Sequence, residues 1–214
     1  MNEIMMLLTA AVYAVFLRNL LFSGGLGASE MIRAAQRNSE IILTSAMISL
    51  FTATTAVLSL GLTLFINARR DVAHEFFHYR FSIFTLPYTW YAAIYAVVLL
   101  LLYVLVNVII ALLPLKHKRI LHKRMGMSVL NALVMSVPLL LYRQGNVYIW
   151  PAIGMGLGAG VAFYFVTMLI NSGMHILQQN KAIPPMFSGV PATLIYTGLL
   201  ALAFTGFVGG EPLF

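Results

Sequence analysis

The sequence predicts an all-α integral membrane protein with six transmembrane helices. Hydrophobic residues make up 61% of the 214 positions and charged residues only 9%, whereas an average soluble domain has about 25% charged residues. The mean hydropathy is +0.91. Apolar runs of about 20 residues, long enough to cross a bilayer, occur at Ile4–Phe22, Ile41–Ile66, Tyr88–Leu113, Met125–Tyr142, Ile149–Ile170 and Val190–Val208.

The first span is predicted to stay in the mature protein, and the basic residues set its orientation. The chain begins MNEIMMLL, with no basic residue before Arg18, so it lacks the positive segment that opens a secretory signal peptide. Cytoplasmic loops carry an excess of Lys and Arg. Loops one, three and five contain Arg33, Arg37, Lys116, Lys118, Arg119, Lys123, Arg124 and Lys181, against Arg69, Arg70, Arg80 and Arg143 in loops two and four. Both termini are therefore expected outside, and the net charge of +7 requires no nucleic-acid partner.

The chain is predicted to form one membrane domain of two inverted three-helix repeats, about 1–115 and 116–214. The basic segment LKHKRILHKR leaves three spans on each side of it, and an odd number of spans per repeat inverts the second repeat. Each repeat opens with an interrupted span: FSGGLGAS in the first, and NALVMSVPLLLY in the fourth, which has Pro138 inside it. The backbone N–H and C=O groups of an irregular segment at membrane depth need hydrogen-bond partners from protein or from a polar cavity. We therefore expect the two broken helices to meet. Alternatively, the glycines simply form the turn that ends span one.

Polar residues at these interruptions are the candidates for an ion path. Arg18 is a cation inside a span, which by default marks function, although its long side chain can also reach the interface. Asn107, Asn131 and Asn171 are expected to make interhelical hydrogen bonds. The glycines of GMGLGAG, at 154 to 160, are expected to pack helices inside the bundle, with a dimer face as the alternative. The candidate ion path consists of Arg18, Ser23, Gly24, Gly25, Gly27, Asn131 and Ser136.

The segment HEFFH offers a second, competing chemistry. His74 and His78 flank Glu75 in the H-E-x-x-H pattern of zinc peptidases. A catalytic zinc ion usually has three protein ligands, but the only acid after Glu75 is Glu211, in the predicted outer tail. We therefore interpret the segment as the solvated face of an interfacial helix, and keep a metal site at His74 and His78 and a peptidase as weaker hypotheses.

The C-terminal segment IPPMFSGVPATLIYTGLLALAFTGFVGG resembles the end of the RnfA/NqrE family of six-span membrane subunits. That family closes with a Pro-x-Phe-x-Gly turn and a Leu-Ile-x-x-Gly-Leu-x-x-Leu-Ala-Phe-x-Gly-Phe span. FLRNLLFSGGLGASEMIRAA resembles more loosely the family's first broken helix, with Arg18 at its basic place and Gly27-Ala28-Ser29 at its Gly-Val-Ser. The C-terminal matches are Pro184 or Pro185, Phe187, Gly189, Leu194, Ile195, Gly198, Leu199, Leu202, Ala203, Phe204, Gly206 and Phe207.

The resemblance implies a subunit of an ion-pumping electron-transfer complex in a bacterial or archaeal cytoplasmic membrane. In such complexes this subunit pairs with a homologous six-helix subunit of opposite topology, and the pair holds one [2Fe-2S] cluster through cysteines from the broken helices. This chain has no cysteine. The family's ligand places fall on Ser23 and between Asn131 and Ser136, where hydroxyls and amides are poor substitutes for thiolates. We expect no cofactor bound by this chain alone.

Three functional hypotheses follow. The first is a divergent Rnf-like or Nqr-like subunit that acts as a scaffold or ion-path element, surrounded by lipid and by the other subunits of its complex, and not catalytic by itself. The second is an independent transporter of small ions or solutes. The third is the zinc peptidase. No acid lies within the predicted spans, so a cation path would depend on carbonyls, hydroxyls or a partner.

Overall fold

The computed structural model describes residues 2–17, 19–37, 41–76, 88–112, 122, 125–126, 128–180 and 183–208. All the regular secondary structure within these ranges is helical, which confirms the predicted all-α class. The elements are α1 (Glu3–Val12), the π-helix η1 (Tyr13–Leu17), α2 (Leu20–Gly24), α3 (Ala28–Ala35), α4 (Ile41–Phe76), α5 (Tyr88–Leu112), α7 (Ala132–Arg143), α8 (Ile149–Gln179), the 3₁₀ turn η4 (Pro185–Phe187) and α9 (Val190–Val208).

Helix lengths agree with a protein that crosses the membrane several times. Four segments in the described ranges are long and apolar enough to span a bilayer: Glu3–Phe22, Ile41–Ala68, Trp90–Leu112 and Ile149–Gln179. Two further apolar helices, Ala132–Arg143 and Val190–Phe204, are shorter. The outer face of α5 is strongly apolar and open, with Leu101 64% exposed and Leu112 80% exposed, as expected for side chains that face lipid.

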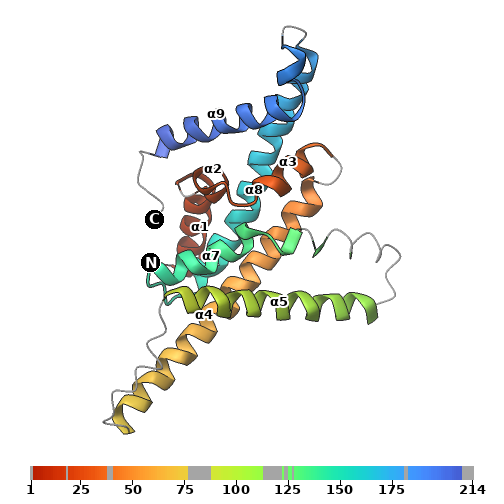
Figure 1. Cartoon of the computed structure of the whole chain (residues 1–214). Coiled ribbons are helices and arrows are strands. Elements are labelled where there is room, and N and C mark those ends of the chain that lie inside the picture. Colours follow the sequence, from red (N-terminus) through yellow and green to blue (C-terminus); the bar gives the residue numbers. More distant parts are fainter. Residues whose placement is uncertain are drawn as a thin grey trace.

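The core forms where α8 crosses α4 and α1. Figure 1 shows α4 and α8 as two long helices that cross in the middle of the molecule, with α1 and α7 against them. Buried side chains from these helices make one cluster, including Ile48 on α4 and Phe163 and Val166 on α8, each fully buried. The broken segments around α2, α3 and α7 pack onto this cluster, so the core fixes their positions.

Glycines on α8 allow this close crossing. A methyl group at Gly156 would collide with the backbone of Ala53, and one at Gly160 would collide with Ser49, both on α4. Gly154 and Gly158 face the other way, against the carbonyl oxygens of Leu7 and Ala11 on α1. Two pairs of glycines, each spaced by four residues, therefore serve two different neighbouring helices. The predicted packing role of GMGLGAG inside the bundle is confirmed.

Candidate functional site

The first broken span contains an asparagine that starts a new helix. α1 widens into the π-helix Tyr13–Leu17, and Asn19 is then the N-cap of α2. The Oδ1 atom of Asn19 accepts hydrogen bonds from the backbone N–H groups of Leu21 at 3.2 Å and Phe22 at 3.4 Å. Its Nδ2 donates to the Val15 carbonyl at 3.0 Å. Since Asn19 is only 2% exposed, one buried carboxamide satisfies backbone groups on both sides of the break.

A second interruption follows at the predicted glycines. Gly25 ends α2 with φ +63°, and Gly27 precedes α3 with φ +84°. Residues with a Cβ atom rarely adopt this left-handed backbone conformation, whereas glycine adopts it readily. The helix is therefore interrupted earlier than the sequence predicted, at Asn19, and again at Gly25 and Gly27, where the sequence predicted it.

The fourth predicted span breaks at Asn131. This residue is the N-cap of α7, and its Oδ1 accepts a hydrogen bond from the Leu133 N–H at 3.1 Å. Asn19 caps α2 in the same way, two residues ahead of Leu21. Ser136 lies in the first turns of α7 and donates to the Leu133 carbonyl at 2.7 Å. Pro138 lies within α7, so the helix begins before the proline and continues through it.

The two broken spans meet at Gly27 and Asn131. A methyl group at Gly27 would lie 2.9 Å from Oδ1 and 3.0 Å from Nδ2 of Asn131, which is closer than such atoms normally approach. α2 also contacts α7. Among the described residues, the Nδ2 atom of Asn131 is one of the buried polar atoms that have no hydrogen-bond partner. The predicted meeting of the two interruptions is confirmed, and a carboxamide occupies the contact.

The structure describes only some of the other predicted site residues. Ser23 and Gly24 belong to α2, while Arg18 lies outside the described residues. His74 belongs to α4, which extends beyond the predicted span, and His78 lies outside the described residues. Within the part of the chain that the structure describes, no three His, Asp or Glu residues are grouped as metal ligands.

The three asparagines have three different roles. Asn171 of α8 donates to the Ala35 carbonyl at the end of α3, so its predicted interhelical bond is confirmed. Asn107 donates to the carbonyl of Tyr103 at 2.8 Å within α5, so the interhelical expectation is wrong there. Asn131 caps its own helix, and its Nδ2 has no partner among the described residues, so the interhelical expectation is wrong there too. Sequence reasoning missed the capping role of Asn19, although an Asn directly before an apolar helical run is an N-cap signal.

The residues at the junction do not fit an iron-sulfur cluster. Cluster iron is held by thiolates, or by imidazoles in a few cases, and the chain has no cysteine. Where the broken helices touch, the described side chain is a neutral carboxamide, already engaged with the backbone of α7. Ser136 likewise donates to a backbone carbonyl. The chemistry available at this contact is hydrogen bonding by neutral groups.

No protein-family model matches the chain. Two curated proteins from Rhodobacter capsulatus do, and both are named as a subunit of an ion-translocating oxidoreductase complex. Each is 36% identical over 93 residues, which cover 42% of this chain and 47% of the relative. The matched region thus spans about half the length of these relatives. These matches support the resemblance to the RnfA/NqrE family that the sequence motifs indicated.

Proposed function

We propose that this chain is a membrane subunit of an ion-translocating electron-transport complex, and that it acts there as a scaffold or ion-path element without a [2Fe-2S] cluster of its own. The relationship to the two Rhodobacter proteins supports the kind of complex. The contact between Gly27 and Asn131 carries the proposal for this chain, because a carboxamide occupies the junction of the broken helices in a protein without cysteine.

The proposal includes six spans arranged as two inverted repeats. Asn19 and Asn131 support this arrangement, because each starts the second part of an interrupted span and each accepts from the N–H two residues ahead. The predicted spans that contain them are the first and the fourth, and therefore the opening span of each half. Equivalent interruptions in two halves are the usual mark of such repeats. Both termini would lie outside the cytoplasmic membrane of a bacterium or archaeon.

Electron carriers would be supplied by partner subunits, since the described junction presents no redox group or metal ligand set. Candidates are a homologous six-helix subunit of opposite topology and the other subunits of a Rnf-like or Nqr-like complex. The exposed apolar surfaces of α5 and α9 are compatible with lipid and with such neighbours. The alternative is an independent transporter of small ions or solutes, which would need no electron carriers.

Purification from the native host tests this proposal. The full chain, tagged and extracted in mild detergent, should co-purify with a homologous six-span protein and with flavin-binding or ferredoxin-like subunits, as identified by mass spectrometry. Iron measured on the same sample should belong to the partners and should fall to zero per chain once they are dissociated. A chain that purifies alone, or only with copies of itself, would contradict the proposal and favour the independent transporter.

The zinc content of the same sample tests the remaining alternative, a zinc peptidase with its metal site at HEFFH. One zinc ion per chain that is lost in His74→Ala but kept in His175→Ala, a matched replacement on α8, would support a metal site at HEFFH. Absence of bound zinc from the wild-type chain is the result we expect, because no later acid is available as a third ligand within the predicted spans.

A further inference from the structure

Two helices begin at one place in the molecule, where the broken spans meet. Gly27 is the N-cap of α3 and Asn131 is the N-cap of α7, and the Asn131 carboxamide lies directly against Gly27. The first N–H groups of an α-helix have no acceptor within the helix, and the helix dipole adds a partial positive charge at the same end. The positive ends of α3 and α7 therefore lie together.

The first turn of α3 has backbone donors left over. No side chain caps this helix, because its N-cap is a glycine. Its regular bonding begins with the N–H of Met31, which donates to the Gly27 carbonyl at 3.0 Å. The N–H groups of Ser29 and Glu30 come before it and have no carbonyl acceptor within α3. Ser29 is exposed, so this turn is accessible from outside the bundle.

The side chain of Asn131 adds a buried donor at the same point. Its Oδ1 accepts from the Leu133 N–H at 3.1 Å, which fixes the orientation of the carboxamide. Its Nδ2 carries the two protons, yet it has no hydrogen-bond partner in the described part of the chain, although Asn131 is only 6% exposed. A methyl group on Gly27 would lie 3.0 Å from this Nδ2. The donor without a partner therefore faces the start of α3.

Other asparagines of the bundle use their Nδ2 atoms within the protein. Asn19 caps α2 through Oδ1 in the same way, but its Nδ2 donates to the Val15 carbonyl at 3.0 Å. The Nδ2 atoms of Asn107 and Asn171 also donate to backbone carbonyls. A buried polar atom without a partner is uncommon and requires an explanation. At Asn131 the missing partner has to be an acceptor.

We propose that the junction of α3 and α7 binds a small anion such as chloride. The N–H groups of Ser29 and Glu30 and the Nδ2 of Asn131 would donate to it. Helix N-termini bind anions through exposed N–H groups and the helix dipole, so no basic side chain is needed. A cation is disfavoured at this point, because protons and the positive ends of two helices would face it. Chloride is the simplest probe, since a single spherical ion accepts hydrogen bonds from any direction.

Glu30 is the acidic side chain in this turn, and its charge is balanced. Its carboxylate forms an ion pair with Arg33, which lies three residues later on α3. The carboxylate is therefore already engaged by a cation of its own helix. The backbone N–H of Glu30 is a separate group and stays available as a donor.

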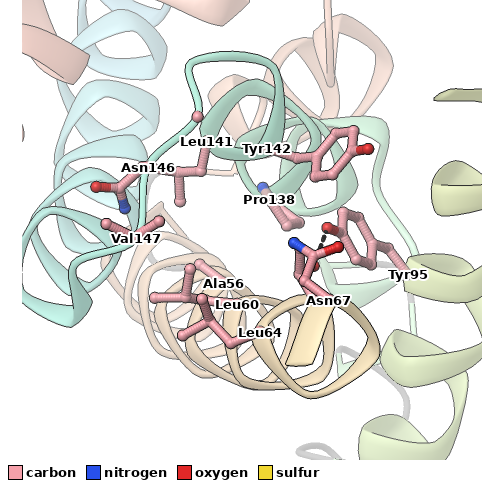
Figure 2. A pocket seen from close by; sticks show the side chains of 12 residues that line it. Ala56, Leu60, Leu64, Asn67, Tyr95, Pro138, Leu141, Tyr142, Asn146 and Val147 are labelled. Carbon is pink, nitrogen blue, oxygen red and sulfur yellow. Dashed lines mark hydrogen bonds between the residues drawn. The ribbon is translucent and has the colours of Figure 1, made fainter. Parts of the chain in front are cut away.

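The small cavity in Figure 2 is a different place. It has a volume of about 90 Å³, lies between α4, α5 and α7, and is lined mostly by apolar side chains. Thr63 and Tyr95 line it, and Thr63 Oγ1 donates to the Ser59 carbonyl at 2.8 Å and lies 2.6 Å from the Tyr95 hydroxyl. Because Thr63 has a single hydroxyl proton, Tyr95 donates the second bond. Both protons are thus engaged within the protein and are not offered to an anion.

The anion site goes beyond the proposed function. It uses the Gly27–Asn131 contact but requires no partner subunit, so binding can be measured on the full chain alone. A chain that purifies without electron-carrying partners would contradict the proposed function and leave this inference intact. Absence of chloride binding would overturn this inference and leave the membership of a complex intact.

The test is a chloride titration of the full chain in detergent, at constant ionic strength with gluconate as the balancing anion. ³⁵Cl line broadening and the thermal unfolding midpoint are the two readouts. We expect saturable broadening and a rising midpoint, because a ligand that binds only the folded state stabilises it. Asn131→Ser keeps a capping oxygen but loses Nδ2, and should weaken the apparent affinity about tenfold or more. Asn131→Asp also keeps a cap, and its negative charge should abolish chloride binding.

Asn19→Ser is the matched control, because it makes the same replacement at a cap whose Nδ2 is bonded within the protein. Its chloride affinity should equal that of the wild type even where its unfolding midpoint is lower. Tyr95→Phe, in the cavity of Figure 2, should also bind as the wild type does. The inference is overturned if the wild type shows no saturable response, if Asn131→Asp binds chloride as tightly as the wild type, or if either control loses as much affinity as Asn131→Ser.

Discussion

Gly27 lies against the side chain of Asn131, so that the two interrupted parts of the chain touch at one glycine and one carboxamide. A methyl group on Gly27 would approach Oδ1 of Asn131 to 2.9 Å. Gly27 precedes α3 and Asn131 caps α7. The contact therefore fixes the relative positions of helices that are far apart in the sequence, and it does so with neutral groups.

Gly27→Ala should destabilise the protein by about 1–3 kcal/mol. The backbone there has φ +84°, which strains any residue with a Cβ, and the new methyl group would collide with Asn131. The measurement is the thermal unfolding midpoint in detergent.

Gly25→Ala is the matched control for that variant, because Gly25 has φ +63° but no atom within 4 Å of the position that a methyl group would take. It should show the backbone penalty alone, about 1–2 kcal/mol. Combining Gly27→Ala with Asn131→Ala should recover part of the loss. Equal effects of the two glycine variants would contradict the proposed contact with Asn131.

Gly156→Ala should destabilise the bundle by about 1–3 kcal/mol, because the added methyl group would push α8 away from α4 at Ala53. Gly61→Ala on α4 is the control. No atom lies within 4 Å of a methyl group there, so this change should be neutral or stabilising by up to about 1 kcal/mol. Thermal unfolding midpoints of the two variants in the same detergent show whether steric contact or helix propensity determines the effect of replacing glycine by alanine. A neutral Gly156→Ala would refute the close crossing.

Hydropathy was sufficient to locate four helices that are long and apolar enough to cross a bilayer, because a bilayer requires about 20 apolar residues per crossing helix. The described α5 agrees with its predicted span, while α4 and α8 begin at the predicted residues and extend beyond the predicted ends. α7 and α9 agree in position but are short as continuous apolar helices. The GMGLGAG spacing likewise contained the packing information, since glycines four residues apart face the same neighbour. These features depend on local composition and helical periodicity.

The details of the interruptions could not be derived in the same way. Nothing in YAVFL distinguishes a π-helix from an α-helix, yet Tyr13–Leu17 is a π-helix. The capping bonds of Asn19 depend on where its side chain turns, and Asn107 bonds its own helix although its sequence context resembles that of Asn171. The cavity beside Thr63 and Tyr95 combines residues from three helices, which periodicity along one helix does not reveal.

Serine substitutions should separate the two asparagine caps. A serine hydroxyl can still accept from the backbone N–H of the first turn, so Asn131→Ser should change stability by less than about 0.5 kcal/mol. Asn19→Ser also loses the donation to the Val15 carbonyl and should cost about 1–3 kcal/mol. Unfolding midpoints of the two variants provide the comparison. Asn19→Ala and Asn131→Ala should both be destabilising, and an Asn131→Ser variant that unfolds as early as Asn131→Ala would contradict the capping role.

The Glu30 carboxyl should make stability depend on pH. Glu30 lies in α3, outside the candidate spans, and burial raises its pKa above the ordinary value, while the Arg33 guanidinium opposes the shift. The protonated form is thus favoured by folding. Its contribution to stability is fully present below the unfolded-state pKa and is lost as pH rises through the folded-state pKa.

Glu30→Gln should therefore gain stability relative to the wild type as pH increases from acidic to neutral, as measured by thermal midpoints across that interval. Arg33→Gln, with Glu30 kept, removes the charge that lowers the pKa of Glu30. The loss of stability with rising pH should then occur at a higher pH than in the wild type. A difference between Glu30→Gln and the wild type that stays constant over the interval would show that folding leaves the pKa of Glu30 unchanged.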